Sequence, residues 1–449
     1  MAELMIPKGA VPEPCEIDRK LLSIPRLPKS GVLLALTFLL IYGPRLFGSE
    51  VLDVILIVSI LAFVHYLLRS RGRVKWVRGS AIPIGVLVGL CWYSLVVMLF
   101  SDHQEFFYPL KFARATINYL GVYTVCAWYR RQYGADAIYV ILEHVYWATF
   151  IHGFIMILQY IDSDMAHFIY TLSGYHRWKS YRVTGLTISY NTLTLVQGFG
   201  LLVGIVMQDH FRGRAIRSLF PMSMVVLLLS MLLAGRTAMY LMLAFAAIAL
   251  LIGWRKILLN RRFIRIAVTS CALLLVLRQV VSDSVIYRFN TLTLQPLISP
   301  IESFLRDKTM AGTYAARSLD IIRNEMYFLP EDQATLWFGS SVSGRGSVYI
   351  SSDVGYVLMV FGIGIVGTAA VVAFYIYMLV VGVKWRRYDP WISFLMVAFT
   401  ASVLVLNLKE QTLLTRHAFT ISMLMLCSWY LKRSNAQQDS ANRVTAIGD

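Results

Sequence analysis

Residues 354–381 read VGYVLMVFGIGIVGTAAVVAFYIYMLVV and contain no charged side chain. A helix needs about 20 apolar residues to cross the roughly 30 Å hydrocarbon core of a bilayer, so this stretch is long enough to span it. In lipid, only helices and closed barrels satisfy every backbone amide, and the run is too long and uniform for a barrel strand. It therefore predicts a transmembrane helix.

The whole chain has the same character. Of its 449 residues 57% are hydrophobic and 15% are charged, whereas soluble domains contain about 45–50% and about 25%. The mean hydropathy is +0.62. We predict an all-α integral membrane protein with about twelve transmembrane helices. The expected spans lie near residues 31–48, 50–68, 81–100, 110–129, 136–161, 188–208, 217–234, 236–253, 263–281, 354–381, 391–408 and 416–432.

The basic residues predict the orientation of these spans. The formal net charge is +17, and short basic clusters follow every second span, as the positive-inside rule requires of cytoplasmic junctions. They are Arg69, Arg71, Arg73, Lys75 and Arg78; Arg130 and Arg131; Arg212, Arg214 and Arg217; Arg255, Lys256, Arg261, Arg262 and Arg265; Lys384, Arg386 and Arg387; and Lys432 and Arg433. This explains most of the positive charge without a nucleic-acid partner.

The same rule divides the chain into three parts. We expect a cytoplasmic N-terminal tail at 1–30, a polytopic membrane domain at 31–433 and a cytoplasmic C-terminal tail at 434–449. The outer face then carries two large loops, at about 162–187 and 282–353. These loops are rich in basic residues despite the rule, which indicates either an ordinary solvated surface or an anionic partner.

No cofactor or metal is predicted. The five cysteines include no CxxC pair, which disfavours a disulfide framework or a zinc site. Walker A, HExxH and GxSxG patterns are absent. Gly362, Gly364 and Gly367 spell GxGxxG, but inside an apolar span, where small residues favour helix packing over dinucleotide binding.

Two arginines border apolar runs on the outer side. Arg236 lies in AGRT (234–237), between two spans with almost no loop. Such a charge either snorkels toward head groups or faces a functional cavity, and positive residues are disfavoured on this side. Arg182 lies in HRWKSYRVTGLTISYN (176–191), just before a predicted helix start, and Asn191 beside that start is a further candidate for substrate binding. Trp178 and Tyr181 nearby predict either an interfacial aromatic belt or a surface on which sugar rings stack.

The second outer loop supplies further candidates. The segment YAARSLDIIRNEMYFL (314–329) has the spacing of an amphipathic helix, with Arg317 on its polar side. The segment SSVSGRGSVYISSDVGY (340–356) carries Arg345 and Asp353 among small residues that let a backbone approach a ligand. Asp353 is equally consistent with helix capping, by itself or through Ser352.

These segments resemble the O-antigen polymerase and ligase superfamily, which builds bacterial surface polysaccharides. The resemblance is carried, in order, by RVTGLTISYN (182–191), AGRTAMYLML (234–243), ARSLDII (316–322) and WFGSSVSGRG…SSDVGYVLMVFGIGIVG (337–367). It covers roughly residues 180–370, and the N-terminal third is similar only in hydropathy.

The resemblance implies a GT-C-like glycosyltransferase of the bacterial inner membrane, with a periplasmic active site and a glycan donor linked to undecaprenyl diphosphate. Its partners would be that glycan, membrane lipids and a chain-length regulator. Arginine suits the diphosphate because its planar fork binds phosphate oxygens in pairs. We therefore expect Arg182, Arg236 and Arg317 to clamp the diphosphate, with Arg345 as a fourth member. Lys409, Arg416 and His417, at the last outer turn, are candidate lipid-head contacts.

Three functions remain open on the sequence. Ligases of this superfamily usually carry a histidine in the large periplasmic loop, and this chain has none between His210 and His417. The pattern therefore favours an O-antigen polymerase over a ligase that transfers glycan to lipid A core or protein. A lipid-linked oligosaccharide flippase is the third reading, although no repeated halves support it. Asp353, His176 and Glu325 are the candidate general bases, with Asp353 first.

Overall fold

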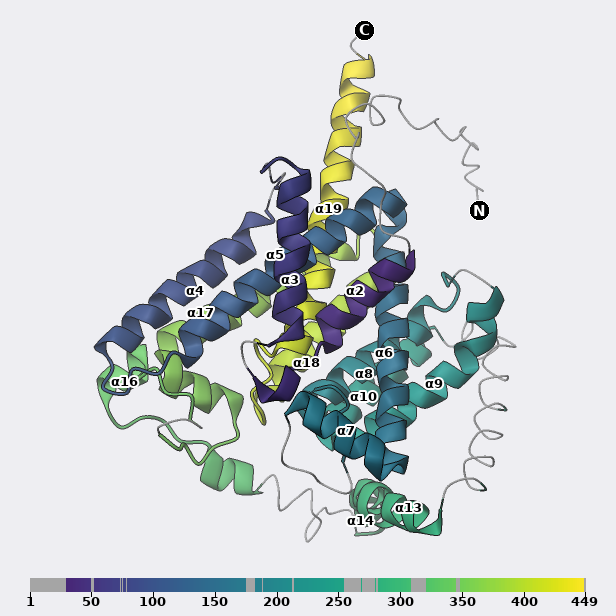
Figure 1. Ribbon diagram of the computed structural model, residues 1–449, viewed down its shortest axis with the longest axis vertical. Coiled ribbons are helices and arrows are strands. Elements are labelled where there is room, and N and C mark those ends of the chain that lie inside the picture. The colour runs from purple at the N-terminus through teal and green to yellow at the C-terminus, as the bar shows by residue number, and fades with distance from the viewer. Residues whose placement is uncertain are drawn as a thin grey trace, which may run out of the picture.

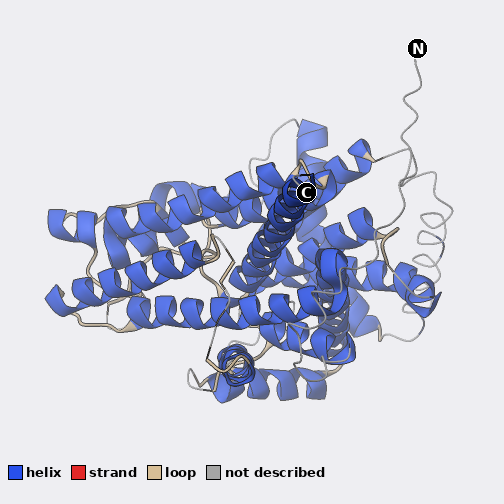
Figure 2. Ribbon diagram, turned by 90° about the horizontal axis from the view of Figure 1, so that it is seen from above, coloured by secondary structure: helices blue, strands red, loops and turns tan. Residues whose placement is uncertain are grey.

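The computed structural model describes residues 30–49, 52–72, 74, 76–77, 79–174, 182–187, 189–211, 214–253, 268, 279, 282–307, 320–344 and 348–447. Within these ranges every regular element is a helix and no β-strand occurs, as Figure 2 shows. The predicted all-α class is confirmed for this part of the chain.

The first half of the chain forms α2 (Ser30–Tyr42), η1 (Leu46–Gly48), α3 (Val54–Arg69), α4 (Ala81–Phe100), α5 (Phe107–Tyr133), η2 (Gly134–Asp136), α6 (Ala137–Ile161) and α7 (Ser163–Ser173). The second half forms α8 (Tyr190–Met207), α9 (Arg214–Ala234), α10 (Arg236–Ile252), α13 (Asp283–Arg288), η3 (Phe289–Leu294), α14 (Gln295–Asp307), η4 (Ile322–Met326), α16 (Gln333–Phe338), α17 (Gly355–Trp385), α18 (Pro390–Leu406) and α19 (Arg416–Ile447).

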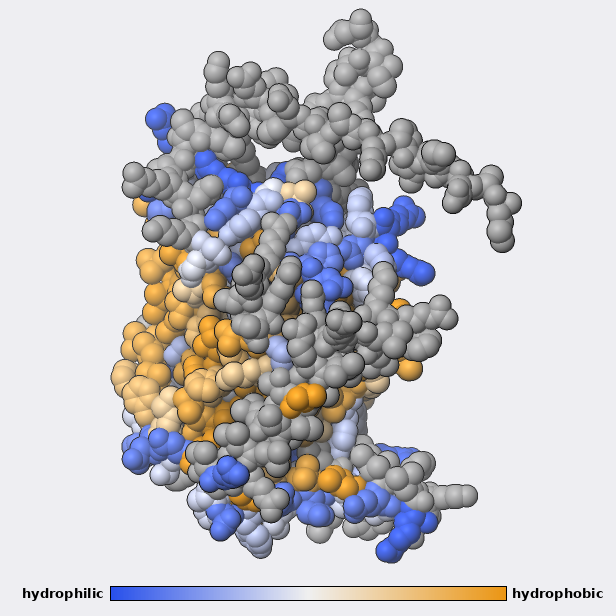
Figure 3. Space-filling view, turned by 90° about the vertical axis from the view of Figure 1, so that its right-hand side faces the viewer, coloured by the Kyte–Doolittle hydropathy of each residue, from blue (hydrophilic) through white to orange (hydrophobic). Residues whose placement is uncertain are grey.

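Four helical runs in the described ranges are long and apolar enough to cross a membrane: Ala81–Phe100, Phe107–Ile161, Tyr190–Met207 and Gly355–Trp385. Five shorter apolar helices accompany them: Ser30–Tyr42, Val54–Arg69, Leu219–Ala234, Arg236–Ile252 and Pro390–Leu406. Large apolar side chains on α3 and α4 face outward, among them Leu61, Leu68, Trp92 and Phe100. On the face shown in Figure 3, an apolar band lies between two hydrophilic ends. These features are those of a protein that could lie in a bilayer.

Helices lie at eleven of the twelve ranges that were predicted as spans, and the twelfth, near 263–281, lies almost wholly outside the described residues. Some boundaries differ from the predicted ones. α2 ends at Tyr42 because Gly43 and Pro44 follow, and a helix usually ends before proline. α19 continues to Ile447, beyond the predicted limit at 433, because residues 434–447 contain neither proline nor glycine.

The bundle has two packed halves. α5 packs against α3, α4 and α19, while α8 packs against α6, α9 and α10. α18 pairs with α17 and also touches α8, so it connects the halves. The helices of the predicted outer loops, α7, α13, α14 and α16, lie toward one end of the molecule, and the C-terminal part of α19 lies toward the other (Figure 1).

The predicted GxGxxG stretch is a break in α17. Gly364 has φ +66°, a conformation that L side chains rarely adopt. The carbonyl groups released by the break accept hydrogen bonds from neighbouring groups. The backbone N–H of Ser340 donates to the carbonyl oxygen of Phe361 at 2.8 Å, and that of Ser341 donates to the carbonyl oxygen of Gly362 at 2.9 Å. The Tyr93 hydroxyl donates to the carbonyl oxygen of Ile363 at 3.0 Å. A broken helix at membrane depth requires such partners. The three glycines therefore serve close packing, against Tyr108, Tyr93 and the end of α16.

Candidate functional site

The loop of residues 407–415 joins α18 to α19 and is held in shape by its own hydrogen bonds. The Oδ1 atom of the buried Asn407 accepts from the backbone N–H of Thr412 at 3.0 Å and from that of the next residue at 3.1 Å. A loop closed in this way holds its side chains in defined positions. Two of them are charged, Lys409 and Glu410.

Lys409 is the centre of a group of charged side chains. Its Nζ donates to Thr237 Oγ1 at 2.7 Å. Its electrostatic partners are two guanidinium groups and two carboxylates, namely Arg182, Arg236, Glu410 and Asp353. Burial lowers the pKa of Lys409 from its usual value, and the two arginines act in the same direction, whereas the carboxylates oppose them. We call these five residues the Lys409 cluster.

Glu410 connects the 407–415 loop to the start of α8. Its Oε1 accepts from Ser189 Oγ at 2.7 Å, and its Oε2 accepts from Asn191 Nδ2 at 2.5 Å. Ser189 is also the N-cap of α8, because its Oγ accepts from the backbone N–H of Thr192. One carboxylate therefore fixes both the helix terminus and the amide side chain beside it.

Gly235 lets α8 and α10 approach each other at this point. Its backbone N–H donates to Thr194 Oγ1 at 2.6 Å. A Cβ atom at this position would overlap the Oδ1 atom of Asn191 and would lie 3.0 Å from its Cα. The glycine of the AGRT motif is thus required by packing, and it places Arg236, the next residue, at the start of α10.

Arg182 is held by a loop that is attached to α6. The backbone N–H of Gly185 donates to Gln159 Oε1 at 2.9 Å, and that of Leu186 donates to His152 Nε2 at 3.0 Å. Gly185 has φ +55°, and the ring of His152 lies where its Cβ would be. The Arg182 guanidinium lies over the ring of Tyr190, 5.7 Å from its centroid.

Arg236 precedes Thr237, whose hydroxyl accepts the hydrogen bond from Lys409. Its Nη2 donates to the carbonyl oxygen of Leu292 at 3.0 Å, which connects α10 to η3 in the predicted second outer loop. The arginine is half-buried and so is in contact with solvent. Its contact with η3 shows that part of this loop folds back onto the cluster.

The Lys409 cluster has the electrostatics of an anion site beside carboxylates. Three helices begin next to it: α8 at Tyr190, α10 at Arg236 and α17 at Gly355. A helix N-terminus carries a partial positive charge and unsatisfied N–H groups, both of which favour a bound anion. Asp353 is exposed just before α17, whose N-cap residue, Val354, makes no side-chain capping hydrogen bond; Ser352 Oγ accepts from the backbone N–H of Val354 at 3.1 Å.

The sequence-predicted residues fall into three groups. The first is gathered in or beside the Lys409 cluster: Arg182, Arg236, Asp353, Lys409 and Asn191. The second lies beyond the loop, at the start of α19: Arg416 pairs with Asp53, and His417 is buried with Nδ1 donating to the carbonyl oxygen of Ile41. The third lies outside the described residues: Arg317, Arg345, Trp178, Tyr181 and His176. Glu325, in η4, is exposed.

Sequence reasoning missed Glu410. A signal for it exists, because Glu410 is the only acidic residue between Asp389 and Asp439, and it follows Lys409 directly. Its importance depends on its partners Ser189 and Asn191, which lie more than 200 positions earlier in the chain.

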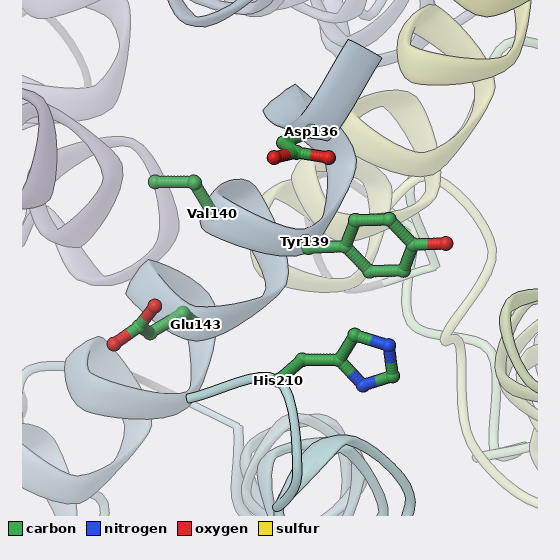
Figure 4. A pocket seen from close by; sticks show the side chains of 5 residues that line it. All are labelled: Asp136, Tyr139, Val140, Glu143 and His210. Atoms are coloured by element: carbon green, nitrogen blue, oxygen red, sulfur yellow. The ribbon is translucent and has the colours of Figure 1, made fainter. Parts of the chain in front are cut away.

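Two cavities lie at opposite ends of α6. One of about 190 Å³ borders the Arg182 loop and is lined by Val183, Gln159, Tyr160 and Arg288, among others. Within this lining the Arg288 guanidinium lies over the ring of Tyr160, 5.7 Å from its centroid. The other, of about 110 Å³, is lined by Asp136, Tyr139, Val140, Glu143 and His210, and its Tyr139 and His210 rings stack (Figure 4). No group of three or more histidine, cysteine, aspartate or glutamate side chains is arranged to hold a metal in the described ranges.

Comparison with known proteins gives no family for this chain. No family model matches the sequence, and no curated protein matches it.

Proposed function

We propose that this chain is an O-antigen-type polymerase, a glycosyltransferase that elongates a glycan on undecaprenyl diphosphate. The observation that carries the proposal is the convergence of Arg182 and Arg236 on Lys409, beside two carboxylates and three helix N-termini. Three cations in one half-buried site suit a diphosphate, which is both the ligand that must be held and the group that leaves.

The proposed reaction is a displacement at the anomeric carbon of the donor glycan. The acceptor hydroxyl oxygen bonds to that carbon, and the bond from the carbon to the lipid diphosphate oxygen breaks with its electron pair on the diphosphate. Arg182, Arg236 and Lys409 stabilise the charge that develops there. The hydroxyl proton passes to a carboxylate.

Asp353 is the stronger candidate for that carboxylate. Both oxygens of Glu410 already accept hydrogen bonds, from Ser189 and Asn191, which favours a positioning role. Asp353 is exposed and interacts electrostatically with Lys409. An exposed carboxylate next to the cationic site can reach a hydroxyl on an incoming glycan.

The membrane arrangement belongs to the same proposal. We place the chain in a bacterial inner membrane with about twelve spans, a GT-C-like architecture and both termini in the cytoplasm. The positions of the helices and of the basic junctions support this orientation, with the Lys409 cluster on the periplasmic side. A cytoplasm-active reporter fused after residue 449 should be active, and a periplasm-active reporter at the same position should be inactive.

The decisive experiment is elongation by the purified chain. With a lipid-linked repeat unit as its sole substrate, the chain should produce a ladder of products. Arg236→Ala should slow the ladder by about 10²–10³-fold, the usual effect of removing one charge-stabilising donor. Arg387→Ala, an exposed arginine beyond the opposite end of α18, is the matched control and should leave the ladder unchanged.

Other outcomes would assign a different function. Equal ladders from Arg236→Ala and Arg387→Ala would refute the diphosphate clamp. A single transfer to a lipid A core acceptor without a ladder would indicate a ligase. Transport of the labelled glycan across proteoliposomes without a change in its length would indicate a flippase.

A further inference from the structure

A second group of cations lies at the starts of α5 and α19, and it has no role in the site described above. It consists of Arg45, Lys111, Arg114 and Arg416 together with the carboxylate of Asp53. We call it the Arg416 cluster. We propose that it binds a second diphosphate, that of the acceptor lipid, which rests on the polymerase function proposed above.

Asp53 is the centre of this cluster. Its Oδ1 lies 3.0 Å from Arg416 Nη1, and its Oδ2 lies 3.6 Å from Arg45 Nε. The side chains of Asp53 and Arg416 are only 6% and 14% exposed. Arg416 also interacts electrostatically with Arg114.

Lys111 completes the group from the first turns of α5. It interacts electrostatically with Arg45. Lys111 and Arg114 are three residues apart on α5, so they lie on the same face of the helix. α5 packs against both α3 and α19, which brings the four cations together from three parts of the chain.

Asp53 is already engaged, because it pairs with two arginines and also caps α3 by accepting from the backbone N–H of Ile55 at 3.0 Å. Among the described residues of the cluster, four cationic side chains thus lie around this one carboxylate. Removing like charges from water is costly unless they are compensated.

One donor in the cluster points to the missing partner. The Nη2 atom of Arg416 is buried and has no hydrogen-bond partner among the described residues. Buried N–H donors are normally satisfied, so this one indicates an acceptor that binds there. Three helices also begin at the cluster, α3, α5 and α19, and their N-terminal dipoles add to the attraction for an anion.

The two clusters lie on the same short loop. Lys409 and Glu410 are near the start of the 407–415 segment, and Arg416 follows its end. The clusters therefore lie on the same side of the bundle, six residues apart along the chain. A polymerase joins two lipid-linked molecules, and both carry a diphosphate.

The chemistry of the clusters differs in a way that suits donor and acceptor. The Lys409 cluster contains an exposed carboxylate, Asp353, next to its cations. In the Arg416 cluster, Asp53 is buried and held by its ion pairs and its helix cap. Such a site can bind a diphosphate that stays intact, as the diphosphate of the acceptor lipid does.

The test counts bound ligands. Native mass spectrometry of the full chain with undecaprenyl diphosphate should show two molecules bound to the wild type. The double variant Lys111→Gln with Arg114→Gln should bind one, and so should Arg182→Gln with Arg236→Gln. The matched control, Arg386→Gln with Arg387→Gln, removes two exposed charges at the opposite end of α18 and should bind two.

A kinetic measurement separates this proposal from the polymerase proposal. In the elongation assay, the double variant Lys111→Gln with Arg114→Gln should raise the KM for the acceptor at least tenfold. The single variant Lys111→Arg, which keeps the positive charge, should have the wild-type KM. A chain that binds two diphosphates but forms no ladder would overturn the polymerase function and leave the second site standing. Two bound molecules in the Lys111/Arg114 variant would overturn the second site.

The source of the diphosphate is tested with inorganic pyrophosphate. If the ligand is a lipid, undecaprenyl diphosphate should bind the Arg416 cluster at least tenfold more tightly than pyrophosphate does. Equal affinities would overturn the assignment to a lipid and favour a soluble diphosphate.

Discussion

Gly235→Ala tests whether close packing of α8 on α10 builds the Lys409 cluster. The backbone of Gly235, with φ −129° and ψ 129°, is one that alanine adopts without strain, so the entire effect is steric. The added methyl would overlap Asn191 Oδ1 and lie 3.0 and 3.1 Å from the Cα and N atoms of the same residue. Ordinary contacts between such atoms are about 3.5–4.0 Å, so the start of α8 must move by roughly 0.5 Å or more.

Two effects of this displacement are expected. Overpacking of this kind costs about 1–3 kcal/mol of stability. The shift would also pull Asn191 away from Glu410, and a misplacement approaching 1 Å at a reacting site can reduce the rate by about 10–100-fold. Thermal unfolding in detergent measures the first effect, and the rate of ladder formation measures the second.

Gly89→Ala is the matched control, because a Cβ atom there meets nothing within 4 Å. It should leave the rate unchanged and should not lower the stability, because alanine is favoured over glycine within a helix such as α4. In an Asn191→Ala background the penalty of Gly235→Ala should shrink, because the overlapping Oδ1 is gone, which gives a measurable coupling between the two positions. If Gly235→Ala is as stable and as active as Gly89→Ala, the packing argument is refuted.

Three further predictions concern single residues. Glu410→Gln removes a carboxylate that raises the pKa of Lys409, so the pKa of Lys409 should fall further and diphosphate binding should weaken at a lower pH than in the wild type. The Kd for diphosphate measured against pH tests this, and Lys409→Arg should abolish the pH dependence. A shift of the binding transition to higher pH in Glu410→Gln would contradict the assignment. His152→Ala leaves the backbone N–H of Leu186 without its acceptor, at a cost of about 1–3 kcal/mol, and should raise the donor KM because the Arg182 loop loosens; an unchanged KM would show that Arg182 is positioned without it. Gly364→Ala places a side chain at φ +66° and against the end of α16, so it should prevent stable folding. The size-exclusion profile and thermal unfolding measure this. Gly85→Ala is the control, because a Cβ atom there meets only open space, and it should behave as wild type.

The sequence predicted the helical class because a bilayer, for which these runs are long and apolar enough, would leave the backbone few alternatives. In a bilayer, a run such as 354–381, which contains no charged side chain, satisfies most of its backbone amides as a helix. The positions of helices therefore followed from hydropathy alone. Their ends depended on local chemistry that hydropathy ignores, such as Pro44 after α2 and the absence of breakers in 434–447. The break in α17 needed its partners, Tyr93 and the 340–341 backbone, before it could be located.

The candidate site was predictable in composition and not in arrangement. Arg182, Arg236 and Asp353 stood out because charges next to apolar spans are costly and so are seldom accidental. That they share Lys409 depends on helices far apart in the sequence, which only packing brings together. Glu410 shows the limit most clearly: its hydrogen bonds to Ser189 and Asn191 form across the bundle. The separation of Arg416 from Lys409 into two clusters was likewise decided by tertiary structure, because Asp53, the partner that holds Arg416, lies at the start of another helix. Local sequence specifies which side chains must avoid lipid, and the packed helices decide which of them meet.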